Sequence, residues 1–348
     1  MHGQCGLFFR TYAGEARIFP SRFLLVSMGL FGAVLCLAPL AMNNYLVSVL
    51  CLINIAVIGA VSLNLLTGFC GQISLGHGAF FGVGAYAAAY LASLGLPFLA
   101  VLPAAGLVTA AVGMFFGLPS LRLKGIYLAI ATLAAQLILE YVFLHWDAVT
   151  GGSSGMAVDP PQVLGLAFDS DVKMFYLTLA VATLSVLCVR NIMRTRLGRA
   201  FVAIRDHHLS AEIVGVDLFA YKLRAFGISS FLAGAGGALW AYYTMYITPE
   251  QFGIGLSVSY LAMIIIGGLG SVLGGVFGAV FITVLPEFLN FVAQHAGALF
   301  TDISGALLAM KEGVFGLVLV LFLIFEPEGL AHRWRLVKAY WKLYPFAH

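Results

Sequence analysis

The chain has 348 residues, of which 61% are hydrophobic and only 9% are charged, and its formal net charge is +3. Soluble globular domains carry roughly 25% charged residues, so this composition excludes a soluble domain and indicates an integral membrane protein. Apolar runs of about 20 residues fit transmembrane helices, and the alternation typical of transmembrane β-barrels is absent. The sequence therefore predicts an all-α, polytopic membrane protein, surrounded by lipid and without a role in nucleic-acid binding.

The apolar segments predict about ten transmembrane helices. In chain order they are 22–42, 45–66, 78–95, 97–117, 125–145, 172–191, 223–246, 256–270, 271–293 and 304–325. The first run is too long for an ordinary signal peptide and has no clear cleavage site, so we interpret it as a retained span. We expect a tail at 1–21, a membrane domain at 22–325 and a second tail at 326–348.

The distribution of basic residues predicts the orientation of these spans. Lysine and arginine cluster in both tails, around Arg122 and between residues 190 and 224. Ten crossings that start inside put each cluster on the cytoplasmic side, and the acidic loop 146–171 then falls outside. The positive-inside rule therefore supports ten spans with both termini in the cytoplasm, although adding or removing one pair of helices would satisfy the same rule.

A polar patch, "GFCGQISLGHGAF" at 68–80, precedes the third predicted span. It holds four glycines together with Gln72, Ser74 and His77. A simple crossing would need none of these residues, so we expect a broken helix whose polar groups line a solute path. His77 alternatively bonds to the freed backbone groups or transfers a proton.

A similar motif occurs half a chain later. If spans 1–5 and 6–10 are two halves, the odd number of five inverts the second half relative to the first, as in many transporters. The third and eighth spans would then correspond, and they start with "ISLGHG" at 73–78 and "IGLSVS" at 254–259. This pairing predicts two inverted five-helix repeats with broken helices and adds Ser257 and Ser259 to the solute path. Chance is the other explanation of so short a match.

The segment 194–222 is the one long polar stretch between spans on the predicted inner side. The residues near one helical face are Phe201, Ile204, His208 and Ala211. We expect an amphipathic helix that ends at Gly215 and either rests on lipid headgroups or docks into a cytoplasmic partner.

Ionisable residues within the apolar spans are candidates for function, because burying a charge in lipid is costly. Glu140 and Glu287 lie near the predicted outer ends of the fifth and ninth spans, where each could also reach the interface. An ion-coupled secondary transporter would place carboxylates deeper, and an enzyme would need a converging set of reactive groups. The sequence contains no such set, so we predict no catalytic residues. His207 and His208 do not share a helix face, so we predict no metal site.

Five stretches of the sequence carry a resemblance to a known family. They are "LNLLTGFCGQISLGHGAFFGVGAYAAAYL" at 63–91, "TGGSSGM" at 150–156, "GRAFVAIRDHHLSAEIVGV" at 198–216, "GGLGSVLGGVFGA" at 267–279 and "PEGL" at 327–330. Together they resemble the inner-membrane permeases of branched-chain amino acid ABC transporters, the LivM type. The resemblance implies a bacterial inner-membrane protein that imports branched-chain or related amino acids; the family also includes carriers of urea, short amides and other small solutes.

The resemblance also implies roles for particular residues. The segment 194–222 would hold the coupling helix that inserts into an ATPase subunit, with its contacts at Gly198, Arg199, Ala203, Arg205, Ala211, Glu212 and Gly215. Many family members have acidic residues where this chain has His207 and His208. This difference bears on which ATPase pairs with the chain, and not on whether the segment docks. The outer motif, Thr150, Gly151 and Gly152, would receive a binding protein or close the path, although its glycines also suit a simple turn.

The expected partners are a second homologous permease, two cytoplasmic ATPase subunits and a periplasmic solute-binding protein. The chain has no G-x-x-x-x-G-K-[ST] phosphate loop, so it should bind no cofactor itself, and its partners would use ATP and Mg²⁺. It would therefore be a transport subunit and not an enzyme, and it would work by alternating access.

Overall fold

A computed structural model describes most of the chain. The described residues are 22–120, 125–163, 165–299, 313, 316–317, 319–322, 324–326 and 328–343. The tail 1–21 and much of the predicted tenth span lie outside the described residues.

Nine long helices coincide with the first nine predicted spans. They are α2 (Arg22–Ala41), α3 (Asn44–Leu63), α4 (His77–Ser93), α5 (Phe98–Ser120), α6 (Ile126–His145), α8 (Asp171–Ile192), α10 (Leu218–Thr244), α11 (Ile254–Gly267) and α12 (Val272–Leu299). Two further helices are amphipathic, α9 (Arg196–Ile213) and α14 (Leu330–Leu343). The structure confirms an all-α polytopic membrane protein.

Six helical segments among the described residues are long and apolar enough to cross a membrane. They are Asn44–Phe69, Phe98–Leu118, Ile126–His145, Asp171–Ile192, Pro249–Gly267 and Val272–Phe291. With 17 residues, α4 is shorter than the roughly 20 residues that span a bilayer. The number of ten spans therefore stays a prediction.

Short elements connect several of the spans. They are α7 (Asp147–Thr150), the 3₁₀-helices η2 (Gly152–Ser154) and η3 (Pro249–Phe252), and the strands β1 (Met156–Ala157), β2 (Gln162–Val163), β3 (Leu166–Ala167) and β4 (Tyr246–Ile247). Antiparallel pairing of β1 with β4 joins the loop after α6 to the loop after α10, and β2 and β3 form a hairpin. The sequence had not predicted these strands, because two-residue strands leave no periodic pattern.

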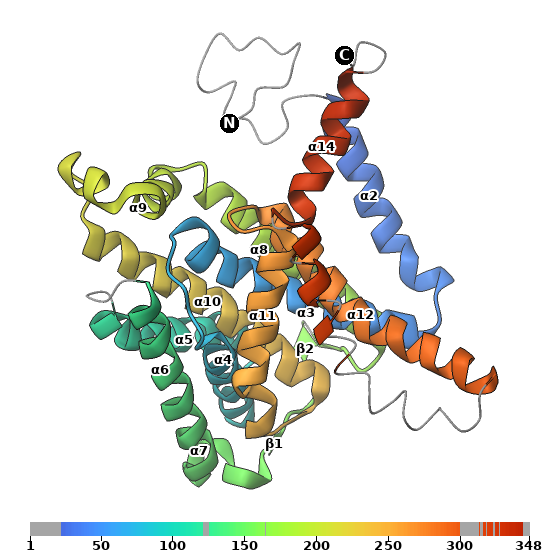
Figure 1. Cartoon of the computed structure of the whole chain (residues 1–348). Helices are drawn as coiled ribbons and strands as arrows, with labels where there is room; N and C mark the ends of the chain where they lie inside the picture. The colour runs from blue at the N-terminus through green and yellow to red at the C-terminus, as the bar shows by residue number, and fades with distance from the viewer. Residues whose placement is uncertain are drawn as a thin grey trace.

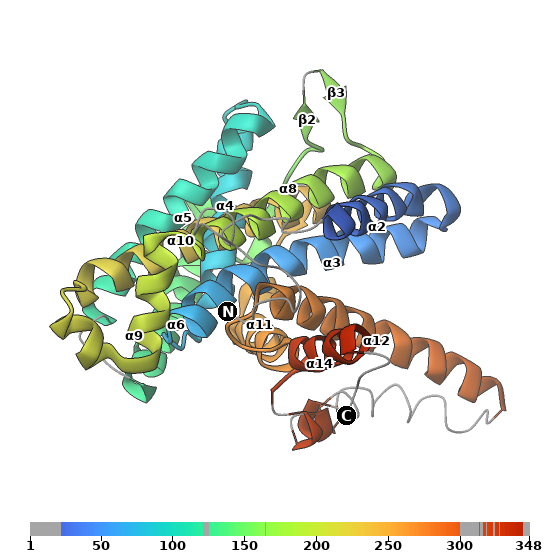
Figure 2. The same ribbon diagram turned by 90° about the horizontal axis from the view of Figure 1, so that it is seen from above.

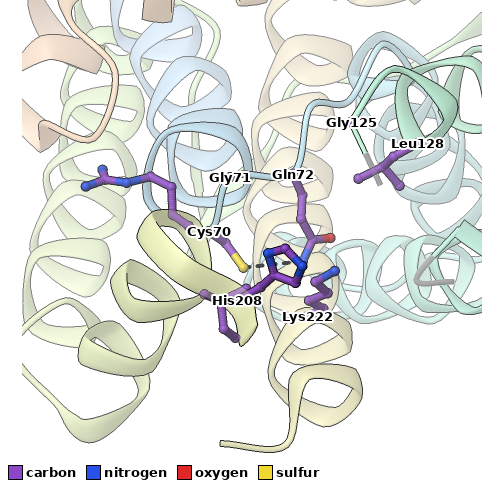
Figure 3. Close-up of a pocket in the computed structure, with 9 residues that line it drawn as sticks. Cys70, Gly71, Gln72, Gly125, Leu128, His208 and Lys222 are labelled. Carbon is purple, nitrogen blue, oxygen red and sulfur yellow. Dashed lines mark hydrogen bonds between the residues drawn. The ribbon is translucent and has the colours of Figure 1, made fainter. Parts of the chain in front are cut away.

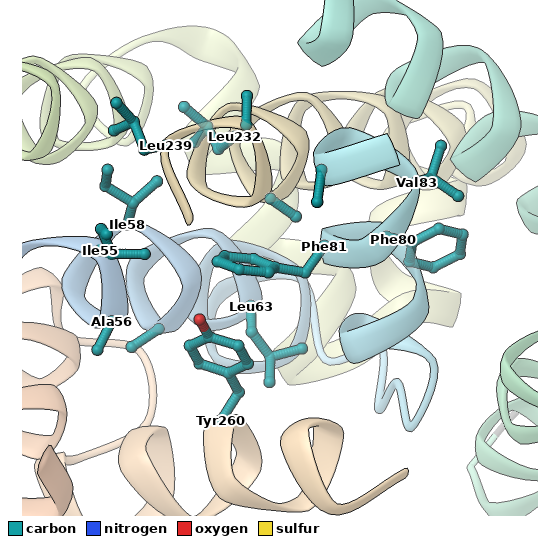
Figure 4. Close-up of a cluster of buried hydrophobic side chains, with 14 of the residues drawn as sticks. Ile55, Ala56, Ile58, Leu63, Phe80, Phe81, Val83, Leu232, Leu239 and Tyr260 are labelled. Atoms are coloured by element: carbon teal, nitrogen blue, oxygen red, sulfur yellow. The ribbon is translucent and has the colours of Figure 1, made fainter. Parts of the chain in front are cut away.

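The core is built where α3, α4, α10 and α11 meet. Figure 4 shows the Phe81 ring of α4 between side chains of α3, α10 and α11. Its ring centroid lies 5.5 Å from that of Tyr260, and Ile58 and Leu239 are fully buried in the same cluster. Around this centre α10 packs on α4 and α5, and α3 packs on α8 and α12 (Figures 1 and 2).

Glycines allow several of these helices to touch through their backbones. A Cβ on Gly84 of α4 would overlap Gly234 of α10, and one on Gly278 of α12 would overlap the carbonyl oxygen of Met263 in α11. Close approach of this kind favours helix association in lipid, where no hydrophobic force draws helices together. Gly270 is not one of these helix-packing glycines, because it lies in the loop between α11 and α12.

The two amphipathic helices lie at the same end of the molecule. Figure 1 shows α9 and α14 at one end and α7 with β1 at the opposite end. The start of α14 touches the loop after α11, since a Cβ on Gly268 would lie 3.4 Å from the Ala331 Cβ. The basic segments of α9 and α14 therefore share one end, as the charge pattern predicts.

Candidate transport site and coupling segment

The predicted helix break lies between α3 and α4. The helix α3 continues into η1, a six-residue π-helix (Asn64–Phe69), and the chain is then non-helical until α4 starts at His77. Gly71 has a φ of +72°, a conformation that glycine adopts readily. Short π-helical turns are rare and often occur at functional sites. The sequence predicted the break and the helix start near His77, but not the π turn.

His77 ties the start of α4 to two neighbouring helices. Its Nε2 lies 2.9 Å from the Ser62 Oγ and 3.0 Å from the Gly59 carbonyl oxygen, both on α3. Its ring meets the Tyr260 ring of α11 edge-on, with 5.4 Å between centroids. Only 1% of His77 is exposed, so in this conformation its contacts are structural.

The first turn of α4 is capped by side chains from other helices. The backbone N–H of Gly78 donates to the Ser257 Oγ at 2.7 Å, and that of Ala79 donates to the Gln136 Oε1 at 2.7 Å. Such N–H groups have no partner within their own helix. Ser257 also donates to the Gln136 Oε1 at 3.0 Å, and the Gln136 Nε2 donates to the Phe252 carbonyl at 2.7 Å. The starts of α4 and α11 are thus joined through α6.

A polar stripe on α6 faces these helix starts. Thr132, Gln136 and Glu140 follow one another at intervals of four residues, which places them on one face of the helix. The Thr132 Oγ1 accepts from the Leu75 N–H at 2.9 Å, and the Glu140 Oε1 lies 3.8 Å from a Cβ placed on Gly253, just before α11. Sequence reasoning singled out only Glu140, although the spacing of four was visible.

The residues predicted to line the solute path do not form one cluster. Ser74 and Ser257 are fully buried, and Ser257 joins the cluster around the α4 start. Ser259 instead bonds within its own helix, to the Gly255 carbonyl at 2.9 Å. In the two matching motifs, α4 starts at the fifth position and α11 at the first position, so the motifs are offset by one helical turn.

The helix α9 has the predicted buried face and the predicted end. Phe201, Ile204 and Ala211 are buried, and His208, the fourth predicted member of this face, is half-buried. Gly215 has a φ of +90°, and its N–H donates to the Glu212 carbonyl at 2.9 Å while that of Val216 donates to the Ala211 carbonyl at 3.0 Å. This pair of bonds is a Schellman motif, which ends the helix.

The helix also has a kink that the sequence did not predict. The backbone is non-helical at His207, with φ −154° and ψ 88°, so α9 is kinked. The kink lies two residues after Arg205, whose side chain is held by the break in the spans. The part of α9 before the kink is therefore fixed to the membrane core.

Arg205 joins α9 to the break between α3 and α4. Its Nη1 donates to the Gly68 carbonyl of η1 at 3.0 Å. The aliphatic stem of Arg205 lies against Gly71, where an added Cβ would be 3.0 Å from the Arg205 Cγ. A Cβ added to Gly270 would lie 2.6 Å from the Arg205 Nη1. A side chain at either position would crowd Arg205, so glycine suits both.

Asn64 of η1 bonds to the loop between α11 and α12. Its Oδ1 accepts from the Gly270 N–H at 3.0 Å, and its Nδ2 donates to the Ser271 carbonyl at 2.7 Å. Arg205 and Asn64 thus connect α9, η1 and the loop between α11 and α12. We call these contacts the coupling junction, and its residues are Asn64, Gly68, Gly71, Arg205, Gly270 and Ser271. Sequence reasoning included only Arg205 among the coupling residues.

The other predicted coupling residues divide by exposure. Gly198 and Ala211 are buried and Ala203 is half-buried, whereas Arg199 and Glu212 are exposed. Gly198 sits so close to the Met193 backbone that a Cβ would overlap it.

The outer motif forms a tight turn. The Thr150 Oγ1 donates to the carbonyls of Phe143 and Trp146 at 2.8 and 2.9 Å and accepts from the Gly152 N–H at 3.2 Å. Gly151 and Gly152 have φ values of +70° and +58°. These contacts fit the turn interpretation, and a role in receiving a binding protein stays a prediction.

Two cavities lie at opposite ends of α6. One is an open, apolar hollow of about 310 Å³ lined by Tyr141, Val142, His145 and Trp146. The other, which we call the inner cavity, has a volume of about 250 Å³ (Figure 3) and is lined by Cys70, Gly71, Gln72, Gly125, Leu128, Ile204, Arg205, His208 and Lys222. The predicted path residue Gln72 therefore lies beside α9 and not in the His77 cluster.

Comparison with known proteins identifies the family. Residues 45–323 match the family model described as "Branched-chain amino acid transport system / permease component". The "High-affinity branched-chain amino acid transport system permease protein LivM" of Salmonella typhimurium is 31% identical over 317 residues, which cover 84% of this chain and 71% of that protein, and the Escherichia coli protein of the same name gives the same values. The "Autoinducer 2 import system permease protein LsrC" of Enterobacter sp. is 29% identical over 52% of this chain and 53% of that protein. The chain belongs to the family of permease components of branched-chain amino acid transport systems.

Proposed function

We propose that this chain is the membrane-spanning subunit of a binding-protein-dependent ABC importer that moves branched-chain or related amino acids into the cytoplasm. Family membership and the names of its LivM relatives support this solute class. The chain works in the inner membrane with a second homologous permease, two ATPase subunits and a periplasmic solute-binding protein. Both termini and α9 face the cytoplasm, and the turn at Thr150–Gly152 faces the binding protein.

Alternating access is driven by ATP and Mg²⁺ bound to the separate ATPase subunits. The observation that carries this mechanism is the Arg205 contact with Gly68, because it fixes a helix outside the spans to the break within them. When the ATPases close, they pull on the exposed residues of α9, and Arg205 passes the movement to η1. ATP must engage the two conformations differently for this to do work.

The test of this function uses the chain purified with its permease and ATPase partners. ATP hydrolysis is measured with candidate binding proteins, each empty or loaded with a solute. We expect stimulation only by a loaded binding protein, and the solute that stimulates is the substrate. Solute uptake by this chain alone, driven by a pH or sodium gradient, would contradict the proposal and support an ion-coupled secondary transporter.

Another solute of the same family is the second candidate. A 29% identical relative is named as an autoinducer 2 import permease, so similar chains serve different solutes. Substrate choice would then reside largely in the binding protein. Urea and short amides therefore belong in the same hydrolysis assay, where stimulation by them and not by amino acids would favour this candidate.

A further inference from the structure

The start of α14 is seated against the loop between α11 and α12. Ala331 is buried, and a Cβ on Gly329 would lie 2.7 Å from the Gly268 Cα. The Trp334 ring meets the Phe277 ring of α12 edge-on, with 6.0 Å between centroids. The first turn of α14 is therefore held in place by the membrane domain.

Beyond this first turn the helix is exposed, and part of its exposed surface is apolar. All residues from Arg333 to Tyr340 are exposed. Leu330, Trp334 and Val337 are four and three residues apart, which places them along one side of the helix. We call these three residues the apolar stripe, and Trp334 and Val337 are each 52% exposed. Exposed apolar side chains on one side of a helix indicate a surface that meets lipid or another molecule.

A second stripe, which is basic, runs beside the apolar stripe. Its members are Arg335 and Lys338, which are also three residues apart. Each follows a member of the apolar stripe by one position, which is a rotation of about 100° around the helix. The basic stripe therefore borders the apolar stripe along its length and does not lie opposite to it.

The charges of the basic stripe are not neutralised by the described part of the chain. Arg335 and Lys338 are exposed, and neither forms an ion pair with a residue that the structure describes. The two acidic residues just before the helix, Glu326 and Glu328, bond instead to Arg333 and His332. The helix itself contains no acidic residue. The basic stripe is therefore complementary to an anionic surface.

The position of α14 and its residue types favour lipid as that surface. The helix follows the predicted tenth span by only a few residues, and Figure 1 shows it at the same end of the molecule as α9. Tryptophan is enriched where membrane and water meet, and the long side chains of arginine and lysine reach from apolar surroundings to the headgroups. Basic amphipathic helices next to a span bind anionic lipids in this way.

We propose that α14 lies on the inner surface of the bilayer and binds the headgroups of anionic phospholipids through Arg335 and Lys338. Trp334 and Val337 enter the boundary between headgroups and acyl chains. This surface is separate from the transport function proposed above. Because α14 begins beside Gly268, two residues before Gly270 of the coupling junction, lipid binds next to that junction.

The experiment places the full-length chain and its permease partner in nanodiscs of pure phosphatidylcholine or of an equal mixture with phosphatidylglycerol. An environment-sensitive fluorophore is attached to Val337→Cys or to Ala339→Cys, which lies on the opposite side of the helix. The background lacks the native cysteines. With phosphatidylglycerol, emission from Val337→Cys should shift to shorter wavelength, and emission from Ala339→Cys should shift less. High salt should reduce the shift, because it screens the charges.

Charge variants test the basic stripe in the Val337→Cys background. Arg335→Gln combined with Lys338→Gln should abolish most of the shift caused by phosphatidylglycerol. Arg335→Lys combined with Lys338→Arg keeps both charges and should retain it. Arg196→Gln removes an exposed arginine of α9 and should also retain it. If the labelled variants do not assemble, mass spectrometry of the purified unlabelled complex decides, and the double glutamine variant should retain fewer phosphatidylglycerol molecules than the wild type.

Three results would overturn the proposal. The first is the same emission in both kinds of nanodisc, and the second is an equal shift at Val337→Cys and Ala339→Cys. The third is a shift that appears only when the ATPase subunits are added, which would assign α14 to a contact with protein. The hydrolysis assay with loaded binding proteins tests the proposed function separately, so it can succeed where the lipid site fails.

Discussion

Gly215 ends α9 with a φ of +90°, and its N–H closes the helix onto the Glu212 carbonyl. A β-branched side chain in this region of backbone space is strained by roughly 1–2 kcal/mol, whereas asparagine is tolerated at such positions. We therefore expect Gly215→Val to reduce ATP-driven uptake several-fold and Gly215→Asn to retain most of it. The measurement is uptake in proteoliposomes, normalised to the amount of inserted chain.

Glu212 gives the same end of α9 a second test. Its side chain is exposed, so Glu212→Lys should leave insertion intact and weaken the link between hydrolysis and transport. Unchanged uptake in both Gly215→Val and Glu212→Lys would remove the end of α9 from the coupling contact.

His77 is the residue whose interpretation the structure changes most. Its contacts with Ser62, Gly59 and Tyr260 are buried, so His77→Ala leaves a cavity and unpaired polar groups. We expect this change to lower the free energy of unfolding by about 2–4 kcal/mol. Thermal unfolding of the purified chain measures the loss. His145→Ala is the control, because His145 is exposed and its printed contacts, a bond to the Tyr141 carbonyl and stacking on the Tyr141 ring, lie within its own helix turn. Equal stability of the two variants would contradict the structural role.

At the scale of single elements, the π-helix η1 is where α3, α9 and the loop after α11 meet. Asn64→Ala removes both bonds that hold Gly270 and Ser271. We expect uptake to fall about tenfold while hydrolysis continues, because the loop no longer follows α9. Asn64→Asp keeps the acceptor and loses the donor, so its uptake should be intermediate.

Asn54 provides a matched control for this element. It is another buried amide on α3, and its Nδ2 donates to the Thr178 Oγ1 of α8 at 3.3 Å, away from the coupling junction. Asn54→Ala should therefore keep the ratio of uptake to hydrolysis. An equal loss in Asn54→Ala and Asn64→Ala would assign the effect to general damage of α3.

The nine long helices could be predicted from the sequence to within about six residues at each end, because long apolar runs in lipid must satisfy their backbone bonds internally. The helix break at Gly71 and the end of α9 were also visible, since glycine and polar residues mark both. The π turn, the kink at His207 and the role of Gln136 were not, because they depend on contacts between segments distant in the sequence. Gly78 and Ser257, for example, are 179 residues apart.

At the scale of the whole molecule, α9 and α14 share one end and α7 lies at the other. Single cysteines at exposed positions test this in a background without the native cysteines. In intact cells with a permeabilised outer membrane, a membrane-impermeant maleimide should label Trp146→Cys but neither Leu209→Cys nor Tyr340→Cys. The pattern should reverse in inside-out vesicles, and labelling of Trp146→Cys and Leu209→Cys from one side would contradict the arrangement.

We propose that the coupling junction transmits the movement of α9 to the spans through Arg205. The most direct test is the number of solute molecules transported per ATP hydrolysed, measured in proteoliposomes that hold the complete transporter. We predict that Arg205→Ala lowers this ratio about tenfold or more while hydrolysis continues, because a charged hydrogen bond to Gly68 is lost. The control Arg196→Ala, an exposed arginine of the same helix, should keep the wild-type ratio. An unchanged ratio in Arg205→Ala would show that Arg205 does not couple α9 to the spans.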